Sequence, residues 1–470
     1  PYRLSNTPMS GGAVGGGLQI IDWNNNVTWD YTWSNNDHQQ HHECIPIEQE
    51  DGTYHALLIA WERKNNTAVI QAGRQNTNGE MWPTEIVEIQ PVGFNGGNII
   101  WEWQMPTQDI CEPHHDIALL PNGNFLVICE ETKTQQEALD AGLEDINGPI
   151  TLDMVVEVQP IGVDDAAIVW KWHFWDHLIQ DRGPEYTVTY GELADYPELL
   201  DINVTGPGDN NGISDWNHCN KISYNANFDQ IVLSSRFMNE IYVIDHSTTT
   251  EEAASHSGGN SGMGGDFLYR WGNPQNYDRG TSDDQILNAQ HGVDWIPSGY
   301  PGEGNFLLYN NRHQTNPNRS AILEFECIAD ENGFYPINDN EPFGPSELVW
   351  VYQADFFSNT QSGAYRLPNG NTIITVTNQQ DIFEVNYNGE LEWEYSQNVQ
   401  CARALKYGYD YFNTDLIGDV NFDNELNILD VVIIVQMILG NQEVNLIGDV
   451  NGDGGLNIQD IILLLNLILS

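Results

Sequence analysis

Four histidines in this sequence share one local setting, since each lies just ahead of an alternating apolar run that is typical of a short β-strand. They are His42, His115, His218 and His291. Three arginines come just after runs of the same kind: Arg63, Arg236 and Arg312. Near neutral pH an uncharged imidazole can act as a nucleophile or general base, and a guanidinium suits the oxygens of sulfate, phosphate or carboxylate. Brought together, these side chains would form a site for a small anion.

A purely structural role is the alternative for these histidines. A single histidine at the start of a strand can simply hydrogen-bond to its neighbours. Four of them beside Arg236 favour a ligand, because removing several groups that can carry positive charge from water is costly unless an anion compensates them.

The elements that must position these residues follow from a repeated aromatic doublet. Its copies are Trp29-x-Tyr31, Trp101-x-Trp103, Trp170-x-Trp172, Tyr269-x-Trp271, Trp350-x-Tyr352 and Trp393-x-Tyr395. Each lies on a β-type run, and turn signals such as Pro-Asn-Gly-Asn separate the runs. Repeated units of four short strands are typical of a β-propeller. The clearest units are 115–120, 124–130, 153–158 and 168–172, and then 364–367, 372–377, 382–386 and 391–395.

The pattern therefore predicts an all-β, six-bladed β-propeller over residues 18–412. In the sixth blade, the first strands of the chain (18–23 and 27–31) would join the last ones (400–405 and 408–412), and this closure removes exposed sheet edges. Inner strands of a propeller start on the face to which second strands return. The four histidines, the three arginines and the long connections 131–150 and 176–216 should share that face.

These segments resemble the bacterial arylsulfate sulfotransferases, enzymes that need no nucleotide donor. The resemblance is carried by residues 113–124, by Asp215-Trp216-Asn217-His218, by Ser234-Ser235-Arg236 and by Gln290-His291-Gly292, and it spans about residues 18–412. It implies a six-bladed propeller with its active site around the central channel. It also implies transfer of a sulfuryl group from an aryl sulfate to a phenol.

The resemblance also implies roles for individual residues. His291 would be the nucleophile that transiently carries the sulfuryl group. Arg236, His115 and His218 would hold the sulfate oxygens, and either His291 or His115 would take the proton of the acceptor phenol. Arg63, Arg312 and His42 are further substrate-binding candidates, and they come from the expected geometry rather than from the family pattern.

Composition restricts the partners of the chain. There are 16 Lys and Arg against 68 Asp and Glu, so the net charge is −52. Such a charge argues against nucleic acids and anionic membranes as partners. No run is long enough to span a bilayer. The six cysteines lack CxxC spacing, and Cys111 and Cys129, which flank one predicted hairpin, are the best candidates for a disulfide. A chain that begins at Pro1 without a signal peptide suits a processed, secreted protein.

Residues 413–470 hold two repeats of a cation-binding pattern, and segments 416–439 and 446–469 align without gaps. The first set of candidate ligands is Asp419, Asn421, Asp423, Glu425, Asn427 and Asp430, and the second is Asp449, Asn451, Asp453, Gly455, Asn457 and Asp460. Oxygen ligands at this spacing wrap Ca²⁺ in EF-hand loops. Each loop precedes an apolar helix, at 431–439 and 461–469.

This C-terminal segment resembles a type I dockerin, the paired calcium-loop module that binds a cohesin partner. The predicted organisation is thus a Gly-rich tail (1–17), a propeller (18–412) and a small all-α EF-hand-like dockerin domain (413–470) with two Ca²⁺ ions. The partner would be a cohesin-like protein or other copies of this chain.

Two other functions remain open from the sequence. In the first, the protein is a non-catalytic extracellular subunit, and its Gly-rich N-terminus and calcium-loaded tail join copies into a homo-oligomer, a fibre or a surface layer. In the second, which is the weaker, the histidines serve a metal-assisted lyase or a redox propeller. No carboxylate-histidine ligand set is evident in the sequence to support it.

Overall fold

A computed structural model describes most of the chain: residues 2–4, 15–22, 25–49, 53–71, 81–105, 111–144, 146–204, 215–396, 400–407, 418–421, 426–442, 448, 450 and 455–469. The chain divides into two compact units. One comprises residues 1–47 and 55–406, and the other comprises residues 48–54 and 407–470. In the described residues, no helix is both long and apolar enough to cross a membrane.

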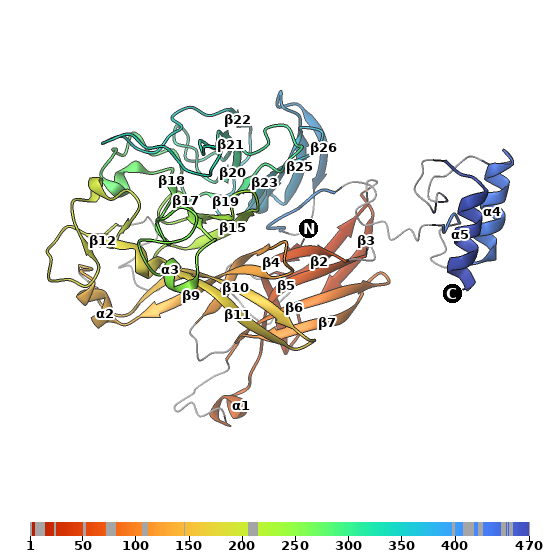
Figure 1. Cartoon of the computed structure of the whole chain (residues 1–470), viewed down its shortest axis with the longest axis horizontal. Coiled ribbons are helices and arrows are strands. Elements are labelled where there is room, and N and C mark those ends of the chain that lie inside the picture. Colours follow the sequence, from red (N-terminus) through yellow and green to blue (C-terminus); the bar gives the residue numbers. More distant parts are fainter. Residues whose placement is uncertain are drawn as a thin grey trace. The chain divides into compact units, whose positions relative to one another are not determined.

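Five four-stranded sheets form a five-bladed β-propeller, and the strands of each sheet follow one another in chain order (Figure 1). The first blade holds β4 (His38–Glu48), β5 (Tyr54–Glu62), β6 (Thr84–Val92) and β7 (Gly96–Gln104). The second holds β8 (Glu112–Leu119), β9 (Phe125–Lys133), β10 (Ile150–Ile161) and β11 (Asp165–His173). The third holds β15 (Cys219–Asn225), β16 (Gln230–Ser235), β17 (Glu240–Asp245) and β18 (Tyr269–Trp271).

The fourth blade holds β19 (His291–Trp295), β20 (Phe306–Asn310), β21 (Ala321–Phe325) and β22 (Trp350–Tyr352). The fifth holds β23 (Gly363–Arg366), β24 (Thr372–Val376), β25 (Asp381–Val385) and β26 (Leu391–Ser396). The strands expected from the sequence for the second and fifth blades are therefore confirmed to within a few residues, because period-two alternation and Pro-Asn-Gly-Asn turns mark them clearly.

The expected count of six blades is wrong. The strands expected to join the sixth blade, β2 (Gly16–Ile21) and β3 (Val27–Thr32), pair with each other, and β2 also pairs with β1 (Tyr2–Leu4), in a three-stranded sheet. At the other end, residues 400–407 contribute one bridging residue, Cys401, and no strand, while residues 408–412 lie outside the described part. The doublet Trp29-x-Tyr31 is genuine but belongs to this smaller sheet, so counting doublets overestimated the blades.

Segment 401–404 fills the space between the last blade and the three-stranded sheet. Cys401 and Ala404 pack with Leu367, Ile373 and Ile382 of the fifth blade. Ala402 packs with Leu18 and Trp29 of the three-stranded sheet. The two ends of the propeller unit therefore meet through apolar contacts.

Tryptophans of the doublets join neighbouring sheets through their ring nitrogens. Trp29, Trp101, Trp172, Trp271 and Trp350 each donate a hydrogen bond to a backbone carbonyl of the sheet that follows or of its connections, and Trp170 donates to the hydroxyl of Thr248. Three of these bonds are Trp29 to Gly96 (2.8 Å), Trp101 to Asp165 (3.0 Å) and Trp350 to Tyr387 (2.9 Å). The rings themselves are buried. The doublet thus combines a large apolar area with a hydrogen bond that fixes one blade against the next.

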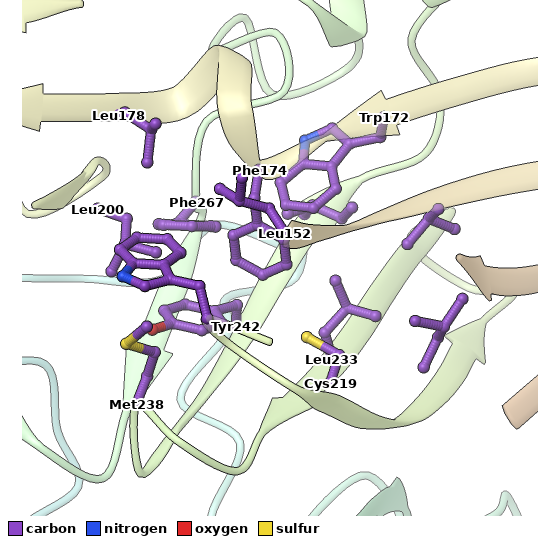
Figure 2. Close-up of a cluster of buried hydrophobic side chains, with 14 of the residues drawn as sticks. Leu152, Trp172, Phe174, Leu178, Leu200, Cys219, Leu233, Met238, Tyr242 and Phe267 are labelled. Atoms are coloured by element: carbon purple, nitrogen blue, oxygen red, sulfur yellow. The ribbon is translucent and has the colours of Figure 1, made fainter. Parts of the chain in front are cut away.

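The largest buried cluster lies between the second and third blades (Figure 2). Trp172 lies in the second blade, and Phe174 follows it. Both pack against Tyr242 and Phe267 of the third blade, whose rings stack with their centres 4.4 Å apart. Leu178 and Leu200 of the long insertion close this cluster from the side. The insertion is therefore part of the core and not a loose loop.

Shorter elements lie in the connections. The insertion after the second blade contains η1 (Phe174–His177), η2 (Leu193–Asp195) and a small sheet of β12 (Leu178–Gln180), β13 (Thr189–Tyr190) and β14 (Leu200–Asp201). The other short helices are α1 (Asn66–Gln71), α2 (Gln135–Asp140), α3 (Thr250–Ala253), η3 (Pro274–Tyr277) and η4 (Thr377–Gln379).

A disulfide joins Cys111 and Cys129, whose Cα atoms are 5.2 Å apart. The predicted pairing of these two cysteines is therefore confirmed. It ties the residue ahead of β8 to β9.

The second unit contains two helices, α4 (Ile428–Ile438) and α5 (Ile458–Leu469), which pack through Ile434 and Leu464. The expectation of a separate all-α dockerin domain is not supported. The chain is mostly sheet with few helices, and these two helices are the only ones in the described part of the segment. Much of both loops, which would have to define such a domain, lies outside the described residues.

A buried ion pair fixes the insertion to the third blade. Arg270 of β18 and Glu240 of β17 are both fully buried, and Arg270 donates to the carboxylate at 2.6 and 2.9 Å. Its third nitrogen donates to the carbonyl of Leu199 in the insertion at 2.8 Å. Removing one partner of such a pair leaves an uncompensated charge in the core.

We therefore expect Arg270→Ala to lower the free energy of unfolding by about 3–5 kcal/mol. The matched control is Arg319→Ala, which removes a solvent-exposed pair with Asp355 and should cost less than about 1 kcal/mol. Urea denaturation followed by tryptophan fluorescence would measure both. Similar losses for the two variants would contradict the assignment of Arg270 as the anchor of the insertion.

Candidate active site

The first strands of successive blades lie against one another, with β8 beside β15, β15 beside β19, and β19 beside β23. His115 lies in β8, His291 begins β19, and His218 directly precedes β15. His42 lies in β4, the first strand of the first blade. Because these strands adjoin, residues at their starts converge, as the sequence pattern predicted.

Backbone conformation turns three of these histidines out of the regular strand pattern. His42, His115 and His218 have φ values of 52°, 57° and 50°, in the left-handed region that non-glycine residues rarely adopt. The pairing of β8 with β9 shifts register between Pro113 and Ile117, so His115 lies in a bulge. Strained positions of this kind persist only where the surrounding structure holds them, and they concentrate at functional sites.

The fourth histidine is placed by a different residue. In β19 the left-handed position belongs to Ala289 (φ 53°), two residues ahead of His291. Gly292 (φ 70°) is then the unpaired residue of a bulge between His291 and Val293. A side chain there would be strained, so glycine is required directly beside the histidine.

The imidazole rings form one cluster. The ring centre of His115 lies 4.2 Å from that of His42, 4.6 Å from that of His218 and 5.9 Å from that of His291. The Nε2 atoms of His115 and His218 are 3.0 Å apart, within hydrogen-bond distance. His115 is thus the centre of the group.

The arginines divide into two groups. Arg236 lies beside His291, with 3.4 Å between its Nη1 and the ring Nδ1, and it donates to the carbonyls of Ala289 and Asn359. Arg312 is near enough that, after burial, its charge helps to lower the pKa of Arg236. Arg63 instead contacts the carbonyl of Asn36 and the ring of Trp82. The structure therefore brings Arg236 to the cluster and Arg312 to the neighbourhood of Arg236, while the contacts described for Arg63 are with Asn36 and Trp82.

Burial and mutual repulsion keep three of the imidazoles neutral. Burial lowers the pKa of His42, His115 and His291 well below the usual histidine value, and neighbouring positive groups lower it further. For His291 these neighbours are Arg236 and His218. The Nε2 atom of His291 is buried without a hydrogen-bond partner. A neutral imidazole has one ring nitrogen with a free lone pair, as a nucleophile requires.

Two carboxylates that sequence reasoning missed orient the cluster. Asp215 accepts from Nδ1 of His218 at 2.6 Å, which leaves the lone pair of Nε2 directed at His115. Asp153 lies 2.7 Å from Nε2 of His114. Burial opposes the charged form of His114, but Asp153 outweighs it and raises the pKa to about 9. Only Asp215 had a local signal, since it stands three residues before His218.

A pocket opens onto this cluster and includes His42, His115 and His291 in its lining. Lys221 and Arg403 also line it, and both pair with Asp116, at 2.9 and 3.0 Å. These three residues were missed as well, because they come from blades and chain segments far apart in the sequence. The pocket therefore offers basic side chains to an anion within a protein whose net charge is −52.

The candidate calcium ligands lie in the other unit. The structure describes seven of them: Asp419, Asn421, Asn427, Asp430, Gly455, Asn457 and Asp460. The remaining five lie outside the described residues: Asp423, Glu425, Asp449, Asn451 and Asp453. Asp419, Asp430 and Asp460 are at most 1% exposed. Asp430 and Asp460 each accept the backbone N–H of the asparagine three residues earlier, at 2.9 and 2.7 Å, so the two loops share one geometry.

Comparison with known proteins supplies a family for the propeller. The family model described as arylsulfotransferase (ASST) matches residues 17–409. A comparison with curated proteins found no significant match.

Solved structures add only distant similarity. A protein of unknown function from Bacteroides caccae is 11% identical, with 82% of this chain and 92% of that chain covered, at a TM-score of 0.39. A putative 6-phosphogluconolactonase from Bacteroides fragilis is 12% identical, with 83% and 92% covered, at 0.36. The virginiamycin B lyase from Staphylococcus aureus is 10% identical, with 82% and 78% covered, at 0.31. Similarity this low carries no functional argument.

The neutral cluster predicts a pH dependence of stability. The pKa values of His42, His115 and His291 are lowered on folding, so below about pH 6.5 the unfolded chain binds more protons. Stability should fall as the pH drops from about 6.5, by up to about 1.4 kcal/mol per pH unit for each histidine. Asparagine tolerates the left-handed backbone, so His115→Asn should reduce this slope by up to the contribution of one histidine, about 1.4 kcal/mol per pH unit.

Urea unfolding at a series of pH values between about 6.5 and 5 would measure the slope, above the range where ordinary carboxylates titrate. His114 provides the contrast, because its raised pKa contributes stability that is complete below about 6.5 and is lost as the pH rises through about 9. An unchanged acid-side slope in His115→Asn would show that the ring is not held neutral.

Proposed function

The chain belongs to the arylsulfotransferase family, and from that premise we propose that it transfers a sulfuryl group from an aryl sulfate to a phenol through a sulfo-histidine at His291. One observation carries the proposal: His291 and His115 line one pocket, Arg236 lies 3.4 Å from the ring of His291, and burial and neighbouring charges lower the pKa of His291 so that its ring is neutral. No described feature of the chain favours the alternative of a non-catalytic assembly subunit.

Binding of the donor would use the basic side chains. Arg236 is half-buried, and its forked donors suit the oxygens of a sulfate ester. Because these groups are removed from bulk water, their interaction with charge that develops on the sulfuryl group is stronger than in solution.

Transfer to the enzyme would form a bond between sulfur and a ring nitrogen of His291 while the bond between sulfur and the aryl oxygen breaks. The aryl group leaves as a phenolate, and the ring proton of the sulfated imidazole is released to it. In the second half, the acceptor phenol attacks sulfur, a base takes the phenol proton, the bond between sulfur and nitrogen breaks, and that proton returns to the ring of His291, which restores the neutral imidazole. No nucleotide enters either half.

The base would come from the hydrogen-bonded chain of Asp215, His218 and His115. Asp215 holds the proton of His218 on Nδ1, so Nε2 of His218 accepts from His115. The remaining nitrogen of His115 then carries a lone pair and can take a proton from the acceptor. A carboxylate behind a histidine also stabilises the imidazolium that forms, as in serine hydrolases.

A second proposal concerns calcium. We propose that each C-terminal loop binds one Ca²⁺, with Asp419, Asn421 and Asp430 in the first and Asn457 and Asp460 in the second among the ligands. Buried carboxylates support this, because Asp419 and Asp430 are at most 1% exposed and no Lys or Arg follows Lys406. A hard oxygen donor set suits Ca²⁺. Secretion and a docking partner for this segment stay predictions.

We expect His291→Ala to lower the rate of sulfuryl transfer from nitrophenyl sulfate to phenol by roughly a thousandfold or more, since a nucleophile is lost. Wild-type protein incubated with donor alone should gain the mass of one SO₃ group on His291, detectable by mass spectrometry.

His173→Ala serves as the matched control, because it removes a half-buried histidine paired with Glu131 at 3.0 Å that does not line the pocket. It should transfer at the wild-type rate. Equal rates for wild type and His291→Ala, or a wild type that releases no nitrophenol, would refute the proposal.

For calcium, we expect equilibrium dialysis to find one fewer tightly bound Ca²⁺ per chain in Asp419→Asn than in wild type. Asp339→Asn, a change at an exposed aspartate of the propeller, should leave the count unchanged. Chelation of Ca²⁺ should lower helical circular dichroism, because repulsion between the buried carboxylates returns. Identical binding by wild type and Asp419→Asn would exclude the first loop as a site.

A further inference from the structure

Three side chains from two segments of the chain meet beside the third blade. They are His177 at the end of η1, His256 after α3, and Asp266 just ahead of β18. Their ligand atoms all lie within 4.8 Å of one another. None of them lines the pocket of the histidine cluster. We propose that these residues bind a divalent transition-metal ion of the Zn²⁺ type, which fastens the insertion to the third blade.

The hydrogen bonds of His177 carry the argument. Its Nε2 lies 2.8 Å from the carbonyl oxygen of Ala253, and a carbonyl can only accept. Nε2 therefore holds the ring proton, and Nδ1 of the neutral ring has a lone pair. That lone pair faces Oδ1 of Asp266 at 2.7 Å. Two lone pairs at this distance need a cation between them.

His256 directs a third donor to the same point. Its Nδ1 also lies 2.7 Å from Oδ1 of Asp266. The cation shared by these atoms is either a proton, carried by His177 or by Asp266, or a metal ion. His177 is 0% exposed, and a buried ion pair loses much of its Coulombic gain to desolvation.

A metal ion satisfies the same geometry. Metal-binding histidines usually donate their other ring N–H to a carbonyl or carboxylate, as His177 does to Ala253. Donors around tetrahedral Zn²⁺ are about 3.4 Å apart, given bonds of about 2.0–2.1 Å, so the two shorter contacts need to open by less than about 1 Å. Two nitrogens and one carboxylate oxygen suit Zn²⁺ rather than Ca²⁺.

The surroundings hold His177 in place for this role. Its ring stacks on Trp172 with centres 5.5 Å apart and planes within 5°. Gly265 passes so close that an added Cβ would lie 2.6 Å from Nε2 of His177 and 2.0 Å from the oxygen of Ala253. A second carboxylate, Glu198, lies close enough that Asp266 adds to the effect of burial in raising its pKa. The site is therefore rigid and negatively charged.

Solvent access completes the arrangement. His256 is 53% exposed, so one side of the cluster faces water and leaves a coordination position for a water molecule or Glu198. The ion would join η1 of the insertion to the segment between β17 and β18. Its role would be structural, because the sequence around it contributes nothing to the pocket.

Zinc titration of the full chain by calorimetry, with Ca²⁺ in excess to occupy oxygen-only sites, tests this proposal. Wild type should bind one Zn²⁺ per chain. His256→Ala should bind it with an apparent affinity lower by roughly tenfold or more, which is the scale seen when support of a metal site is lost. Asp266→Asn, which keeps the shape of the side chain, should show the same loss. His256 is exposed, so its replacement leaves the core intact.

His173→Ala is again the matched control, since it removes another histidine-carboxylate pair and should bind Zn²⁺ like wild type. Zn²⁺ should raise the thermal midpoint of wild type and of this control, but not that of His256→Ala. Equal Zn²⁺ affinity in wild type, His256→Ala and Asp266→Asn would overturn the proposal and leave a proton as the cation of the cluster.

Discussion

The contact between neighbouring sheets is the interaction on which the rest of the structure depends. In five of the doublets a buried tryptophan donates an indole hydrogen bond to the backbone of the following sheet or its connections, as Trp101 does to Asp165. These contacts hold neighbouring sheets together, and the first strands of the same sheets meet at the centre. The histidine cluster is assembled from four such strands, so its ring-to-ring distances of 4–6 Å depend on packing far from it.

Scarce positive charge is placed where it has structural or chemical effect. With 16 Lys and Arg in the chain, Arg270 and Arg366 are fully or nearly fully buried against Glu240 and Glu324, and Lys221 is buried beside Asp116. Arg236 differs, because in the described part of the chain its side chain donates to the carbonyls of Ala289 and Asn359 and lies beside His291. A half-buried guanidinium bonded in this way keeps more of its charge available to a bound anion.

The sequence predicted what is local and missed what is long-range. Period-two alternation located the strands of the second and fifth blades, and the position of His115, His218 and His291 at inner strands followed from it. Blade number depended on what pairs with β2, and besides β3 that partner is β1, for which the sequence carried no alternating pattern. The contacts of Asp153 with His114 and of Asp266 with His177 could not be found, because they join residues 39 and 89 positions apart in the sequence.

The backbone at the histidines separates a structural interpretation of the cluster from a functional one. Histidines that only packed against a channel wall could sit in regular strand conformation, where alternation already directs every second side chain inward. Instead His42, His115 and His218 adopt positive φ values, and His115 lies within a bulge. That conformation is unfavourable for a residue with a Cβ and gives up pairing in the strand. The left-handed conformation occurs at the histidine of three first strands, and it directs the three rings to one point. A fold that needed only stability would gain more from glycine or asparagine at each of these positions.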